Sequence, residues 1–76
     1  MYIEVKTKTG WFVFPNATMV GYSEDTQKLM VETPKALHVF EDVPPDVGEK
    51  IWDYIMPGSA IRVDLVKGRV HEIGKF

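Results

Sequence analysis

Residues 18–40 read TMVGYSEDTQKLMVETPKALHVF and carry the clearest pattern of secondary structure in the chain. Its apolar residues alternate with polar or small ones in three short runs, at residues 18–22, 29–33 and 36–40. A period of two is typical of β-strands. A polar connection at residues 23–27 and a turn at Pro34-Lys35 separate the runs. Strands joined this closely favour an antiparallel meander, because a parallel pair needs a long crossover.

The pattern continues towards the N-terminus. Met1, Ile3 and Val5 fall on one side of an extended segment. A turn at residues 8–10 then leads to a second strand, Trp11 to Phe14, which predicts a hairpin. If the phenylalanines of that strand point inwards, Trp11 points outwards.

The spacing of apolar residues changes after residue 42. Val47, Ile51, Trp52 and Ile55 recur at helical spacing and form one stripe. Prolines before this stripe suit a first helical turn, and Pro57-Gly58 is expected to end the helix, which gives a helix over about residues 44–56. Alternation returns at residues 61–66 and 69–73 with a turn at Lys67-Gly68, so a last hairpin is predicted.

These elements predict one β-rich α+β domain spanning residues 1–76. A curved antiparallel sheet, made of the meander and the terminal hairpins, is expected to carry one helix on one face. A chain of this length cannot cover both faces of the sheet. One face is therefore expected to stay partly open and to contact a partner.

Composition excludes several classes of protein. The 76 residues contain no cysteine, which removes disulfide frameworks, thiolate metal sites and cysteine nucleophiles. Hydrophobic residues make up 45% and charged residues 26%, which is ordinary for a globular domain rather than a disordered one. No apolar run is long enough to span a bilayer and no signal peptide is visible, so a cytoplasmic protein without membrane contact is expected.

Residues 17 to 63 resemble the KTSC domain, a small module that occurs alone and at the C-terminus of some lysyl-tRNA synthetases. The residues that carry the resemblance are Val20-Gly21-Tyr22, Leu29-Met30-Val31-Glu32, His38-Val39-Phe40, Asp42-Val43-Pro44-Pro45-Asp46-Val47 and Pro57-Gly58-Ser59. The chain departs from the family where His38 and Phe40 occupy its two central aromatic positions, and where Ile61-Arg62-Val63 follows the helix. A weaker resemblance links Thr9-Gly10, Phe14-Pro15-Asn16 and the helix to small flagellar-operon proteins, but the chain beyond Pro57 does not fit that outline.

Charge is unevenly distributed along the chain. Residues 1–22 carry a net +1, residues 23–56 carry three lysines against eight acids for −5, and residues 57–76 carry +2. If the terminal hairpins lie side by side, their cations form one patch beside two aromatic side chains that can stack bases. This patch would comprise Lys6, Lys8, Lys67, Arg69 and Lys75, with Tyr2 and Trp11 nearby. The alternative is a solvated hairpin end, and the overall acidity argues against strong non-specific nucleic-acid binding.

The acidic middle offers a second candidate surface. It can meet a basic partner or imitate a nucleic-acid backbone, or it can merely cap the helix and keep the protein soluble. The residues of this alternative are Glu24, Asp25, Glu32, Glu49 and Asp53.

Single residues add little chemistry. Trp11 is the best candidate for an exposed contact residue, with Tyr54 next. The two histidines lack further ligands for a metal, and His38 is expected on the sheet surface. Ser23 and Ser59 stand in no nucleophile pattern and no phosphate-cradling glycine loop exists, so no catalytic residue, metal or cofactor is expected.

The sequence therefore predicts a small non-enzymatic binding module or regulator, of the kind that a virus or plasmid can carry, that contacts another macromolecule. A protein partner is favoured because the net charge is −2 and no nucleic-acid motif is complete. The alternative is a module that binds RNA or single-stranded nucleic acid through the basic terminal hairpins and exposed aromatics. A third hypothesis is that the protein self-associates through exposed strand edges.

Overall fold

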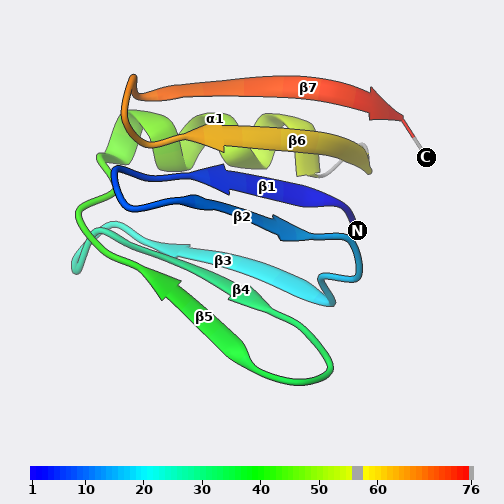
Figure 1. Cartoon of the computed structure of the whole chain (residues 1–76). Helices are drawn as coiled ribbons and strands as arrows, with labels where there is room; N and C mark the ends of the chain where they lie inside the picture. Colours follow the sequence, from blue (N-terminus) through cyan, green and yellow to red (C-terminus); the bar gives the residue numbers. More distant parts are fainter. Residues whose placement is uncertain (56–57, 76) are drawn as a thin grey trace.

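In a computed structural model that describes residues 1–55 and 58–75, the chain forms seven strands and one helix (Figure 1). In chain order these are β1 (Ile3–Lys6), β2 (Trp11–Phe14), β3 (Met19–Ser23), β4 (Lys28–Glu32), β5 (Leu37–Phe40), α1 (Pro45–Ile55), β6 (Ser59–Asp64) and β7 (Arg69–Lys75). The α+β class, the meander, both terminal hairpins and the single helix are confirmed. The predicted helix end at Pro57 lies outside the described residues.

The strands form two sheets rather than one continuous curved sheet. The meander makes a three-stranded sheet in the order β3-β4-β5, and the terminal hairpins make a four-stranded sheet in the order β2-β1-β6-β7. All neighbouring strands are antiparallel except β1 and β6, which pair in parallel. The long connection between them, which includes the meander and α1, permits that parallel pairing. Alternation in a sequence shows which residues share a face but not which strands meet.

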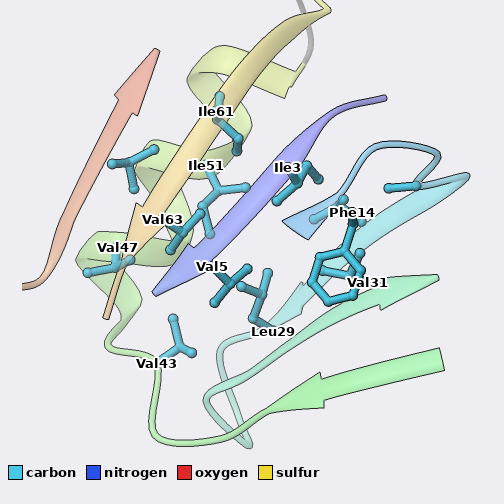
Figure 2. Close-up of a cluster of buried hydrophobic side chains, with 13 residues drawn as sticks. Ile3, Val5, Phe14, Leu29, Val31, Val43, Val47, Ile51, Ile61 and Val63 are labelled. Atoms are coloured by element: carbon cyan, nitrogen blue, oxygen red, sulfur yellow. The ribbon is translucent and has the colours of Figure 1, made fainter. Parts of the chain in front are cut away.

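The core lies between the two sheets and α1 (Figure 2). Ile3 and Val5 of β1 face inwards next to Ile61 and Val63 of β6, with which they pair. Leu29 of β4 closes the core from the other sheet and is fully buried. Each such side chain contributes roughly 1.5–3 kcal/mol through removal of apolar surface from water. Because α1 and the three-stranded sheet both pack on this side, no helix or strand of residues 1–55 and 58–75 covers the opposite face of the four-stranded sheet.

The helix packs with a narrower face than the sequence predicts. Val47 and Ile51 are buried, but Trp52 is 42% exposed, so its assignment to the buried stripe is wrong. A residue directly after Ile51 lies about 100° further around the helix, and here that turns it away from the sheet.

Gly48 is buried because the ring of Tyr22 from β3 packs directly on its bare Cα. The Tyr22 hydroxyl donates a hydrogen bond of 2.5 Å to the Val43 carbonyl just before the helix. A glycine that costs helix propensity therefore serves the contact between α1 and the three-stranded sheet.

The prediction for His38 is also wrong. Its ring lies 4.7 Å from the ring of Phe14, between the two sheets, and it is half-buried. The neighbours Leu37 and Val39 are the residues that point to solvent, at 54% and 47% exposure. The strand alternates as expected, but with the opposite face turned inwards.

Candidate macromolecular contact surface

The open side of the four-stranded sheet gathers aromatic and charged side chains from all four strands. Registers place Glu4 of β1 opposite Val13 of β2 and Arg62 of β6, and Lys6 opposite Trp11 and Asp64. On β7, His71 pairs with Arg62 and Arg69 with Asp64. Side chains alternate along strands, so these residues share one face. We call this surface the Trp11 face; it comprises Tyr2, Glu4, Lys6, Trp11, Val13, Arg62, Asp64, Arg69 and His71.

Glu4 holds the centre of the Trp11 face together. Its Oε2 accepts a hydrogen bond of 2.6 Å from the Tyr2 hydroxyl. Its Oε1 accepts bonds from Trp11 Nε1 at 3.2 Å and from Arg62 Nε at 2.8 Å. Glu4 is only 8% exposed because these three side chains cover it. A single carboxylate thus fixes two aromatic rings and one guanidinium group.

Two cations lie over the Trp11 ring. The Arg62 guanidinium carbon is 4.7 Å from the ring centroid and the Lys6 Nζ is 5.6 Å from it. Both distances allow cation–π attraction, worth about 0.5–1 kcal/mol at exposed sites. Trp11 nevertheless keeps 51% of its surface exposed, so the ring is ordered and accessible at once. This confirms that Trp11 points outwards.

The hydrogen bonds between Tyr2, Glu4 and Arg62 shift the pKa values of Glu4 and Tyr2. The Tyr2 hydroxyl, followed by Arg62, lowers the pKa of Glu4 because each stabilises the carboxylate. The same bond raises the pKa of Tyr2, whose proton is held by Glu4. At neutral pH the cluster therefore contains a carboxylate, a neutral phenol and a guanidinium cation.

Asp64, at the end of β6, is a second buried and hydrogen-bonded carboxylate of this face. Its Oδ1 accepts hydrogen bonds of 3.0 Å from the backbone N–H groups of Val66 and Lys67. These bonds, that from Lys67 foremost, lower the pKa of Asp64. They also shape the turn at residues 65–68, where Gly68 has φ of +67°. Asp64 is 7% exposed, so its carboxylate is engaged inside the turn rather than presented to solvent.

The two terminal hairpin turns adjoin each other. The backbone N–H of Leu65, next to Asp64, donates to the Lys6 carbonyl at 2.9 Å. The turn of the first hairpin is fixed by the Thr7 hydroxyl, which accepts from the N–H groups of Thr9 and Gly10. Exposed Lys8 and Lys67 therefore sit on neighbouring turns, at the end of the sheet that also carries Lys6 and Arg69. Lys75 pairs with Ser59, at the opposite end of β7.

Other predicted contact residues lie elsewhere. Tyr54 is half-buried on α1 and packs against the core, away from the Trp11 face. The acidic residues do not form one surface. Glu24 and Asp25 lie in the β3–β4 turn, Glu32 lies at the other end of β4, and Glu49 and Asp53 are exposed on α1.

Sequence reasoning missed the two residues that organise the face, Glu4 and Arg62. Alternation places each on the outward side of its strand, which was the available signal. Only the parallel register brings the two side chains together across 58 positions of sequence.

The rest of the described chain offers no stronger site. A hollow lies beside the first hairpin, lined by Thr7, Lys8, Thr9, Phe40, Glu41, Asp42 and Leu65. Within residues 1–55 and 58–75, no three His, Asp or Glu side chains are grouped to hold a metal ion. In the same residues no helix has the length and apolar character needed to cross a membrane. Comparisons with protein-family models, with curated proteins and with solved structures gave no match for this chain.

Proposed function

We propose that this chain is a small non-enzymatic binding module that contacts another macromolecule through the Trp11 face. The observation that carries the proposal is the half-exposed Trp11 ring held by Glu4 and Arg62. Interface anchors are enriched in Trp, Tyr and Arg, and all three meet here. Their side chains are already ordered, so binding costs less conformational entropy than it would for mobile side chains.

Two classes of partner suit this face. A protein is the class that the sequence favours, because the net charge is −2 and no nucleic-acid motif is complete, and the cations of this face would suit an acidic protein surface. Single-stranded nucleic acid is the second, and one observation favours it. The carboxylates of the Trp11 face, Glu4 and Asp64, are buried and hydrogen-bonded, whereas its cations reach solvent. The net charge of the chain therefore does not describe the field at this face. A regulatory role in the cytoplasm is the setting we propose for either partner.

The chain supplies a matched pair of variants for the test. Trp11 and Trp52 are its two tryptophans, with exposures of 51% and 42%, and they lie on the four-stranded sheet and on α1. Trp11→Ala is expected to weaken capture of the partner by at least about 10-fold, the loss typical of a central anchor. Trp52→Ala is expected to leave capture unchanged. Affinity capture from lysate with each variant, after circular dichroism has shown an intact fold, makes the comparison.

Equal capture by Trp11→Ala and the unsubstituted protein would contradict the assignment of this face. Loss on Trp52→Ala alone would move the contact surface to α1 and its neighbouring acidic residues.

A further inference from the structure

The accessible charges of the Trp11 face and of the two turns beside it are positive, and the exposed acids Glu41 and Asp42 line the hollow next to the first of these turns. Lys6, Arg62 and Arg69 project from the sheet, and Lys8 and Lys67 from the turns beside it. The two acids of the face, Glu4 and Asp64, are 8% and 7% exposed, and their oxygens already accept hydrogen bonds. Five cations around a buried pair of acids present a positive surface to solvent, so the complementary partner is an anionic one.

The aromatic part of the face discriminates among anionic partners. The Arg62 guanidinium lies over the half-exposed Trp11 indole, 4.7 Å from its centroid, and both planar groups can stack on a nucleobase. Arg62 bonds Glu4 through Nε, and within residues 1–55 and 58–75 its two terminal nitrogens make no hydrogen bond, which leaves a fork suited to a phosphate. An unpaired base next to a phosphate matches this juxtaposition of ring and cations.

A nucleic-acid duplex fits the Trp11 face less well than a single strand does. Its bases are stacked on one another and paired, so no base plane is free to stack on Trp11. Trp11 projects from the face of a four-stranded sheet, not from a helix or a two-stranded ribbon of the kind that enters a groove.

We infer that the Trp11 face binds single-stranded nucleic acid, with a base against Trp11 and phosphates against Arg62, Lys6 and Arg69. This inference rests on the proposed function, because it names the partner of the same face. It needs no sequence-specific contacts, since every base has a stacking surface.

The test is fluorescence anisotropy with three probes: a labelled ten-nucleotide oligo-dT, the corresponding oligo-U, and a duplex of the same length. Binding of the single strands is expected at low salt and should weaken as salt is added. If three to five cations meet phosphates, the slope of log affinity against log salt is about −2 to −3.5. The duplex is expected to bind more weakly at every salt concentration.

Charge variants test the location of the contact. Arg69→Glu on the Trp11 face is expected to weaken binding several-fold and to flatten the salt slope by about 0.7 or more. Lys50→Glu makes the same change of net charge on the exposed side of α1 and is expected to have little effect. Trp11→Ala is expected to weaken binding by between about 5-fold and 100-fold, whereas Trp52→Ala is not.

Three results would overturn the inference. One is the absence of binding to either single strand at low salt. Another is equal weakening by Arg69→Glu and Lys50→Glu, which would indicate a response to net charge alone. The third is displacement of the oligonucleotide by polyglutamate at equal charge concentration, which would point to an acidic protein. If the first result appears while lysate capture still depends on Trp11, the nucleic-acid inference fails and the proposed contact face stands.

Discussion

Glu4 is the residue that turns a set of neighbouring side chains into a defined surface. Its two carboxylate oxygens fix the Tyr2 phenol, the Trp11 indole and the Arg62 guanidinium. Without it, the two rings and the guanidinium would sample several rotamers, and ordering them would oppose binding. The acid that lowers the positive charge of the face is thus the one that preorganises it.

Glu4→Gln tests this role. The amide keeps an acceptor oxygen but removes the charge that balances Arg62, so the free energy of unfolding is expected to fall by about 1–3 kcal/mol. Urea denaturation measures the loss, and the near-UV circular dichroism of Trp11 should weaken with it. Glu24→Gln is the matched control, because Glu24 is exposed in the β3–β4 turn and is expected to change stability by less than about 0.5 kcal/mol. Equal effects of the two substitutions would show that Glu4 is an ordinary surface acid.

The pKa directions predict a pH dependence of stability with two limbs. The pKa values of Glu4 and Asp64 are lowered in the fold, by the Tyr2 hydroxyl and by the Lys67 N–H respectively as the largest causes. Their contribution is therefore present above the ordinary carboxyl range of about 4 and is lost as pH falls through the lowered values. The pKa of Tyr2 is raised by its bond to Glu4, so its contribution is present below about pH 10 and is lost as pH rises through the raised value.

Urea denaturation across the pH range checks both limbs, with a plateau expected between them. Glu4→Gln should shrink the acid limb without abolishing it, because Asp64 remains. An acid limb unchanged by Glu4→Gln would contradict the account of that carboxylate.

At the scale of elements, the contact between α1 and β3 depends on a missing side chain. A Cβ placed on Gly48 would overlap the ring of Tyr22. Gly48→Ala gains about 1 kcal/mol of helix propensity but overfills this contact, which typically costs about 1–3 kcal/mol. We expect a net loss of stability because the Tyr22 hydroxyl anchors the ring to Val43 and limits its retreat.

Two controls isolate that overlap in thermal or urea denaturation. Gly74→Ala in β7 meets no atom within 4 Å and is expected to be close to neutral. In a Tyr22→Leu background, Gly48→Ala should cost less than it does with the tyrosine present. An equal cost in both backgrounds would show that the ring does not determine the choice of glycine.

The strands and the helix were largely predictable from the sequence, whereas the way in which they pair and pack was not. Alternation located the strands, and the stripe from Val47 to Ile55 located the helix to within a residue or two. The errors concern which side turns inwards, as at His38 and Trp52, because a strand or helix face is chosen by what packs on it. The parallel pairing of β1 with β6 depends on the path of α1, which no local pattern records.

At the scale of the whole molecule, the fold separates charges that the composition averages. The acids of α1 and of the β3–β4 turn lie away from the Trp11 face, and the cations of the two chain ends meet at it because β1 and β6 pair. Sequence reasoning named Trp11, Lys6 and Arg69 as candidates, since each stands on an outward position of a terminal hairpin. It could not name the Glu4–Arg62 pair, which exists only in the assembled sheet.

The most direct measurement follows the two indole N–H signals by NMR while a single-stranded oligonucleotide is titrated into ¹⁵N-labelled protein at low and at physiological salt. Trp11 and Trp52 each give one such signal. Trp11 reports on the proposed contact face, and Trp52 reports on α1. If the Trp11 face binds single strands, the signals of the Trp11 indole and of the Lys6 and Arg69 amides will shift, these shifts will diminish with salt, and the Trp52 indole signal will stay constant. Constant signals from Trp11 at low salt, or shifts confined to Trp52 and its helix, would contradict the inference.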